Sequence, residues 1–320
     1  MIELIEKVNT SYSNLKQEIN KVIVGQEEIL KLMLISLMTR GHCLIVGVPG
    51  LAKTLMVSTM AQCLGLDFKR IQFTPDLMPS DITGSEIIEE NAEKGRYYKF
   101  IKGPIFSNIV LGDEINRTPP KTQAALLQAM QERTVTVNGV NYSLDEPFLV
   151  LATQNPIEQE GTYPLPEAQL DRFIFQIDIT YPQRNEEIDI VKNTTSAYEY
   201  ELKKVLNQQD IINIQKIIKQ VPVSDEYVEM AVDIIRATRP DSGNSVAKKW
   251  LSYGAGPRAS QFLILAAKAN AIISGRYGVT REDILSMVKP VLKHRIISNF
   301  NAEAQGAGKD QIISDLLDSL

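Results

Sequence analysis

Short runs of apolar, largely β-branched residues alternate with amphipathic stretches through the first half of the chain. Such runs, bounded by polar segments, are typical of buried strands. The runs that we predict to be strands are Cys43–Val46, Lys69–Phe73, Ile109–Leu111, Phe148–Ala152 and Ile174–Ile179. Because continuous apolar strands separated by helices need cover on both faces, this pattern predicts an α/β fold with a parallel sheet.

The pattern changes to helical spacing beyond residue 182. Ser224 is placed to cap one helix, and Thr280 with Asp283 fits a capping box at the start of another. Apolar residues at helical spacing follow the first cap, namely Val228, Ala231, Val232 and Ile235. We therefore predict two domains, an α/β domain over residues 1–183 and a smaller all-helical domain over residues 184–320.

A short hairpin interrupts the α/β alternation of the first domain. Two strand-like segments, Thr134–Val137 and Val140–Ser143, flank the dipeptide Asn138-Gly139. Asn-Gly favours the left-handed backbone conformations of a tight two-residue turn. Residues 134–143 are therefore predicted to form a β-hairpin.

Composition and charge are those of an ordinary globular protein. The chain is 44% hydrophobic and 23% charged, with a formal net charge of −5. Its 320 residues are enough for two domains with sizeable cores. The chain has no long basic run, so no stable nucleic-acid binding is expected. The N-terminus does not read as a signal peptide, and the most apolar helix, Gln261–Ile273, is too short to span a bilayer. We expect a cytoplasmic protein without a membrane span.

Two cysteines and two histidines limit redox and metal chemistry. Cys43 and Cys63 each sit in an apolar stretch, which indicates buried free thiols rather than a disulfide. His42 and His294 are the only histidines, so a site built from His and Cys ligands is not expected.

The segment Gly47–Thr54 follows an apolar strand and opens a helix, which is the context that a phosphate-binding loop requires. Its glycines let backbone N–H groups converge on a phosphate, and the helix offers its positive end. Lys53 is expected to reach the β- and γ-phosphates of ATP, and the Thr54 hydroxyl to bind Mg²⁺. Ala52 departs from the glycine of the general pattern, but it is small and suits a helix start. The residues expected at the nucleotide here are Gly47, Val48, Pro49, Gly50, Leu51, Ala52, Lys53, Thr54 and Leu55. The alternative is a Gly-Pro turn that happens to precede a lysine.

Two carboxylates, Asp113 and Glu114, follow the apolar strand Ile109–Leu111 and are separated from it only by Gly112. In a parallel sheet the carboxyl ends of strands face the ligand crevice. Asp113 would then hold Mg²⁺, and Glu114 would polarise the attacking water. The alternative is a solvated acidic strand end.

Several motifs, in the right order over roughly residues 20–300, resemble those of the MoxR family of chaperone-like AAA+ ATPases. These motifs are Gly50–Thr54, Asp113–Arg117, Ala152–Pro156, Leu165–Phe173 and Gly256–Ala259. The first of them matches the P-loop of the family and accounts for Ala52.

The resemblance implies roles for three further residues. Asn155 resembles sensor 1, with an Asx turn before Pro156 as the alternative. Arg172 resembles the arginine finger that reaches the nucleotide of a neighbouring subunit, with a local pair with Asp171 or a surface cap as the alternatives. Arg258 resembles sensor 2 at the start of a lid helix, and whether it acts within its own subunit or across a boundary is left open.

The resemblance also assigns three segments. Val22–Gln26, with Val24 and Gly25, resembles the strip that packs on adenine, although an ordinary helix-to-loop joint would look alike. Residues 84–106 resemble the helix-2 insert, and the hairpin at 134–143 stands where the pre-sensor-1 hairpin belongs. Both would face the pore of a ring.

The resemblance thus implies a homo-oligomeric ring, a hexamer, that hydrolyses ATP to remodel protein clients. Clients of the family include von Willebrand A domain proteins, and its members take part in metalloenzyme maturation. A nucleic-acid motor is the alternative, but the insert mixes Arg96, Lys99 and Lys102 with four glutamates, and no DNA-binding module is evident. A scaffold without enzymatic activity would have lost Lys53 or Glu114, which are both present.

Overall fold

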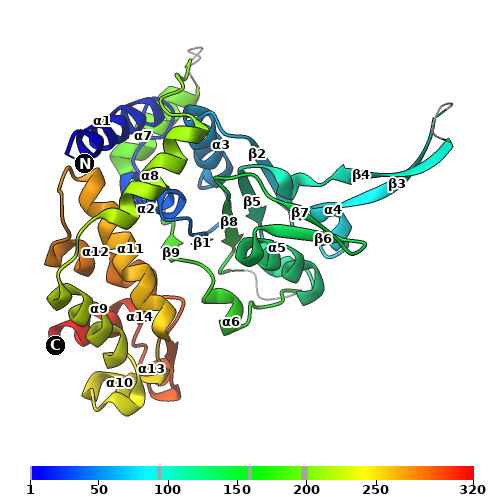
Figure 1. The fold of residues 1–320 in the computed structure, drawn as a ribbon. Helices are drawn as coiled ribbons and strands as arrows, with labels where there is room; N and C mark the ends of the chain where they lie inside the picture. Colours follow the sequence, from blue (N-terminus) through cyan, green and yellow to red (C-terminus); the bar gives the residue numbers. More distant parts are fainter. Residues whose placement is uncertain (1, 92–94, 158–160, 196–200) are drawn as a thin grey trace.

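The computed structural model describes residues 2–91, 95–157, 161–195 and 201–320 (Figure 1). At its centre lies a five-stranded sheet with the strand order β2-β5-β8-β1-β9, in which every pairing is parallel. Its strands are β1 (Cys43–Val46), β2 (Phe68–Gln72), β5 (Ile109–Asp113), β8 (Leu149–Gln154) and β9 (Phe175–Asp178). The predicted parallel sheet is confirmed, with strand ends shifted by a few residues.

Both faces of the sheet are apolar because successive side chains of a strand point to opposite sides. In β1, Ile45 joins the core cluster shared with helices α1, α2 and α3, whereas Leu44 joins a second cluster with α5. These helices are α1 (Ile2–Ile19), α2 (Glu27–Met38), α3 (Lys53–Leu64) and α5 (Pro120–Glu132). Burial of such a side chain contributes roughly 1.5–3 kcal/mol, so both clusters hold the sheet in place.

Two hairpins extend from the α/β part. Strand β3 (Gly84–Asn91) pairs with β4 (Gly95–Lys102) after the short helix α4 (Pro79–Thr83), and Figure 1 shows this hairpin projecting far from the sheet. Residues 92–94 of the insert lie outside the described residues. The second hairpin pairs β6 (Thr134–Val137) with β7 (Val140–Ser143), and its turn lies at Asn138-Gly139, as predicted.

The two hairpins contact each other. The Phe100 ring of β4 stacks on Tyr142 of β7 at 4.2 Å between centroids, and Asn138 Nδ2 donates to Glu86 Oε2 at 2.8 Å. The insert is therefore braced at its base by the second hairpin.

The second part of the chain is helical, with α11 at its centre, packed against α12, α9 and α8. The helices are α7 (Arg184–Thr194), α8 (Gln208–Gln220), α9 (Asp225–Ala237), α10 (Ser245–Trp250), α11 (Pro257–Ile273), α12 (Arg281–Leu292), α13 (Phe300–Ala304) and α14 (Lys309–Asp318). One correction applies to the all-helical prediction: β10 (Leu251–Tyr253) pairs antiparallel with β11 (Ile297–Ser298). Strands of 3 and 2 residues are too short to show an alternating pattern in the sequence.

The helical part is fastened to the start of β9 by Arg295, which follows α12. All five of its N–H groups are used: Nε donates to Asp171 Oδ1 at 2.8 Å, and the two terminal nitrogens donate to four backbone carbonyls. At the other end of the chain, Asn9 of α1 donates to the Ile273 carbonyl of α11 at 2.7 Å, so α1 touches both parts. The division at residues 183 and 184 falls between β9 and α7 and stays a prediction.

Within the described residues, no helix is long and apolar enough to cross a membrane. Cys43 and Cys63 are both buried free thiols, as predicted, and burial raises the pKa of Cys43 to about 12 and that of Cys63 to about 11. These thiols remain protonated near neutral pH and act as small apolar side chains.

Candidate functional site

The P-loop leaves β1 at the carboxyl edge of the sheet and closes on its own lysine. Lys53 is the first residue of α3, and its Nζ donates to the Gly47 carbonyl at 2.5 Å. Burial lowers the pKa of Lys53, while the negative charges of Asp113 and Glu114 act to raise it. The lysine therefore lies within electrostatic range of both carboxylates, and the assignment of these three residues to one nucleotide site stays a prediction.

Gly47 is required sterically at the start of the loop. A Cβ placed there would lie 2.8 Å from the Ile179 carbonyl oxygen, which is closer than side chains approach. The Gly47 N–H donates to the Gln154 carbonyl at 3.2 Å. The loop is thus anchored to the end of β8, the strand next to β1.

Ala52 adopts a left-handed conformation, with φ 54° and ψ 24°. Ala52 is the N-cap that precedes the helix, and its backbone conformation is one that glycine enters without strain. The expectation that alanine suits this position is therefore not supported by its backbone conformation. The glycine of the general P-loop pattern fits this conformation directly.

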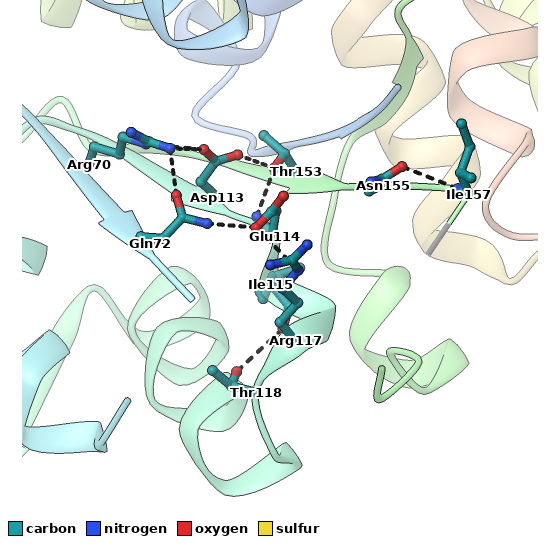
Figure 2. Close-up of polar contacts among 10 residues, drawn as sticks. All are labelled: Arg70, Gln72, Asp113, Glu114, Ile115, Arg117, Thr118, Thr153, Asn155 and Ile157. Carbon is teal, nitrogen blue, oxygen red and sulfur yellow. Dashed lines mark hydrogen bonds and ion pairs between the residues drawn. The ribbon is translucent and has the colours of Figure 1, made fainter. Parts of the chain in front are cut away.

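The two carboxylates at the end of β5 lie side by side (Figure 2). Both are partly buried. Asp113 Oδ2 accepts from Arg70 Nη2 at 2.6 Å, and its Oδ1 accepts from the Thr153 hydroxyl at 2.6 Å. Glu114 Oε2 accepts from Gln72 Nε2 at 2.7 Å and lies 3.3 Å from Arg117 Nε. Each carboxylate is therefore oriented by neighbours on an adjacent strand or turn.

Three of these neighbours were missed by the sequence analysis, namely Arg70, Gln72 and Thr153. The parallel pairing of β2 with β5 sets Gln72 opposite Asp113, and β8 flanks β5 on the other side. The available signal was a polar residue near the carboxyl end of each strand flanking the acidic one. Strand order was not known from the sequence, so that signal could not be used.

Asn155 lies just beyond β8, away from the two carboxylates in Figure 2. Its Oδ1 accepts from the Ile157 N–H at 3.2 Å, which is the Asx turn considered as the alternative. The Nδ2 group is a donor that this turn does not use. Its assignment as sensor 1 stays a prediction.

Arg172 and Arg258 lie at the opposite, amino edge of the sheet. Together with Arg40 and Arg133 they line a cavity of about 210 Å³ that also includes Gly41, just before β1. The P-loop begins at the other end of β1, about 13 Å away at 3.3 Å per residue. The two arginines are therefore close to each other and remote from the P-loop of their own chain.

Asp171 connects Arg258 to this edge rather than pairing with Arg172. Its Oδ2 lies 3.3 Å from Arg258 Nη1 and its Oδ1 binds Arg295, whereas Arg172 Nη1 donates to the Leu127 carbonyl at 2.9 Å. The local pair between Asp171 and Arg172 is thus not the arrangement observed. The finger and sensor 2 assignments stay predictions.

The segment Val22–Gln26 turns sharply against the start of α7. Gly25 and Gln26 have φ values of 68° and 61°, and a Cβ on Gly25 would lie 2.4 Å from Glu186 Oε1. The predicted adenine strip therefore meets the helix that follows the sheet. Val24 and Gly25 stay predicted nucleotide contacts.

The donors at the carboxyl edge fit Mg²⁺ better than any metal held by protein alone. Among the described residues, no group of three or more His, Cys, Asp or Glu side chains could hold a metal ion. Mg²⁺ prefers hard oxygen donors and commonly takes one or two from the protein and others from substrate phosphates. Asp113 and Thr54 offer such oxygens.

Comparison with known proteins places the chain among ATPases. Residues 42–175 match the model of the ATPase family associated with various cellular activities (AAA), and residues 244–316 match the AAA lid domain. The chaperone MoxR1 of Mycobacterium tuberculosis is 41% identical over 95% of this chain and 80% of its own. The protein MoxR of Paracoccus denitrificans is 30% identical over 94% and 92%. A crystal structure of a protein assigned as an ATPase, from Cytophaga hutchinsonii, superposes with a TM-score of 0.92 at 43% identity, covering 99% of this chain and 96% of that one.

Proposed function

Because the chain belongs to the MoxR family of AAA+ ATPases, we propose that it binds ATP with Mg²⁺ at the carboxyl edge of its sheet and hydrolyses it to ADP and phosphate. The observation that supports this most directly is the grouping of Lys53, Asp113 and Glu114 around the end of β8: Lys53 binds Gly47, which is hydrogen-bonded to Gln154, and Thr153 binds both acidic residues. A cation and two oriented carboxylates beside a phosphate loop are what phosphoryl transfer to water requires.

Each residue of this group has a distinct part. Lys53 binds the β- and γ-phosphates. Asp113 and Thr54 would hold Mg²⁺, which would supply positive charge to neutralise the phosphate oxygens. Glu114 orients a water for attack on the γ-phosphorus and accepts a proton from it. Gln72 and Arg117 hold the Glu114 carboxylate in place.

The amino edge supports assembly into a ring. Arg172 and Arg258 line one cavity on the side of the sheet opposite their own P-loop. We assign both to the nucleotide of a neighbouring subunit, so sensor 2 acts in trans here, as the finger does. A closed ring, a hexamer in the family pattern, is the arrangement that gives every nucleotide such a neighbour.

A protein client fits the hairpins better than a nucleic acid does. In the described part of the insert, Lys99 pairs with Glu89 at 3.1 Å and Arg96 with Glu90 at 3.4 Å, so these bases are already matched by acids. Ile88 and Tyr98, which pair across the same hairpin, are exposed by 63% and 72%. The name of the M. tuberculosis relative, a chaperone, agrees with protein remodelling, and von Willebrand A domain proteins and metalloenzymes under maturation are the clients to test first.

Two substitutions test the proposed reaction. Lys53→Ala removes the phosphate-binding cation and should abolish ATP binding, whereas Glu114→Gln removes only the base and should bind ATP without turnover. Nucleotide binding and phosphate release are measured on both, with Glu303→Gln, an exposed carboxylate in α13, as the control. Turnover near the wild-type rate in Glu114→Gln would refute the role of Glu114. The same variant, locked with ATP, is the bait for client capture.

A further inference from the structure

The end of β8 connects the two halves of the predicted ATPase centre. This strand lies between β5 and β1 in the sheet, with β5 carrying the carboxylates and β1 leading into the P-loop. Its Gln154 carbonyl accepts from Gly47 N–H on the P-loop side. The side chain of Thr153, in the same strand, makes the contacts on the β5 side.

Thr153 is fully buried, and its hydroxyl acts both as a hydrogen-bond donor and as an acceptor. The hydroxyl donates to Asp113 Oδ1 at 2.6 Å and accepts from the backbone N–H of Glu114 at 2.8 Å. A hydroxyl has one hydrogen to donate and lone pairs to accept, so this arrangement is complementary. A single atom therefore fixes both a carboxylate oxygen and the backbone of the next residue.

The bond to Glu114 N–H has a conformational consequence. Glu114 has φ 58° and ψ 48°, a left-handed conformation that a residue with a Cβ rarely adopts. Such conformations persist where surrounding contacts hold them. The Thr153 hydroxyl is one of those contacts, and the turn that it holds directs the Glu114 side chain toward Gln72.

We propose that Thr153 is a positioning residue for the metal and the water: its hydroxyl orients Asp113 for Mg²⁺ and holds the left-handed turn that aims Glu114. This inference rests on the proposed ATPase function. It assigns Thr153 no contact with the substrate. Residues that orient a metal ligand through a hydrogen bond affect metal affinity or activity by about 10- to 100-fold.

The test replaces the hydroxyl without changing the shape of the side chain. Thr153→Val is compared with wild type by titrating ATPγS in EDTA and across a series of Mg²⁺ concentrations, and by steady-state hydrolysis of ATP. Affinity in EDTA should be unchanged, because the P-loop is intact. The Mg²⁺ concentration that gives half-maximal binding should rise by about 10- to 100-fold, and kcat should fall more than KM changes.

Two further variants separate the hydroxyl from packing and folding. Thr153→Ser keeps the hydroxyl and should reach half-maximal binding at the Mg²⁺ concentration of wild type. Thr153→Ala lacks the hydroxyl and should require the higher Mg²⁺ concentration expected of Thr153→Val. This pair decides the matter if Thr153→Val does not fold. Thr122→Val is the matched control. Thr122, in α5, also has a buried hydroxyl, which donates to the Leu77 carbonyl at 2.9 Å. The substitution should lower the melting temperature and leave the Mg²⁺ series unchanged.

If Thr153→Val and Thr153→Ala both reached half-maximal ATPγS binding at the Mg²⁺ concentration of wild type, the inference would be overturned. The proposed ATPase function would remain intact. Equal impairment of Thr153→Ser and Thr153→Ala would also overturn the inference, because the methyl group rather than the hydroxyl would then matter. Wild-type protein that neither binds ATPγS nor hydrolyses ATP would remove the proposed function and this inference together.

Discussion

Backbone conformation at single residues distinguishes this site from an ordinary strand–loop–helix joint. Ala52 and Glu114, one in the P-loop and one at the end of β5, both adopt left-handed conformations. For a residue with a Cβ this conformation costs roughly 1–2 kcal/mol. Strain of this kind is concentrated where function requires a particular geometry, and both residues belong to the predicted nucleotide site.

Ala52→Gly should relieve that strain. Glycine reaches φ 54° without a steric penalty but has more freedom in the unfolded chain, so a net gain in unfolding free energy of about 0.5–1 kcal/mol is expected. Urea denaturation measures it. The control is Ala124→Gly, an exposed site in the middle of α5, which should lose about 1 kcal/mol. A loss of similar size at both positions would contradict the strain assigned to Ala52.

At the scale of elements, two buried histidines connect helix ends to the sheet or to the segment just before one of its strands. His42 Nε2 donates to the Met130 carbonyl of α5 at 3.2 Å, and its Nδ1 accepts from Val150 N–H of β8 at 2.9 Å. His294, just after α12, donates from Nε2 to the Phe173 carbonyl at 3.0 Å. Burial lowers the pKa of His42 to about 4, and burial, followed by the nearby Arg295 charge, lowers the pKa of His294 well below its ordinary value.

These histidines predict a loss of stability in mild acid. Below pH 6.5 the unfolded chain binds protons on both side chains, whereas folded His42 stays neutral down to about pH 4. Unfolding is therefore favoured as pH falls, and His42 alone should remove about 1.5 kcal/mol between pH 6.5 and pH 5. Urea midpoints across this window measure the effect. His42→Gln, which keeps one donor and one acceptor, should show a shallower dependence; an unchanged slope would contradict the assignment.

At the scale of the whole molecule, the sheet separates two sets of proposed site residues. Its carboxyl edge holds the P-loop and both carboxylates, and its amino edge holds Arg172 together with Arg258, which lies in the first turn of α11. One subunit alone would leave part of the charge on the transferred phosphoryl group without compensation. An arginine from a neighbour is worth about 10³–10⁵ in rate in related P-loop enzymes.

Mixing of two inactive variants should therefore restore activity in part. Arg172→Ala should bind ATP but lose most turnover, and Lys53→Ala should bind no ATP. In mixed rings, some interfaces join an intact P-loop from the first variant to an intact Arg172 from the second. Phosphate release per subunit should also rise with the concentration of wild-type protein as rings form.

The control is a mixture of Arg172→Ala with Glu303→Gln at matched ratios, in which recovery should follow the active subunit fraction. Absence of any recovery from Arg172→Ala with Lys53→Ala, in mixed rings shown to form by cross-linking, would place Arg172 within its own subunit or make it purely structural.

The sequence by itself determined the parallel sheet, the hairpin turn at Asn138-Gly139, the P-loop and the acidic end of β5. Each of these depends on residues adjacent along the chain: apolar runs set strands, Asn-Gly sets a turn, and glycines before Lys53 set a phosphate loop. Local chemistry is sufficient there because the interacting atoms are within one turn or strand.

Only the tertiary structure decided which distant side chains meet. It placed Thr153, Arg70 and Gln72 on the carboxylates, because strand order brings β2 and β8 to either side of β5. It set Arg258 at the amino edge through Asp171, and it paired β10 with β11. Such contacts join residues far apart in the chain, and their formation depends on how helices and strands pack, which no local pattern of residues specifies.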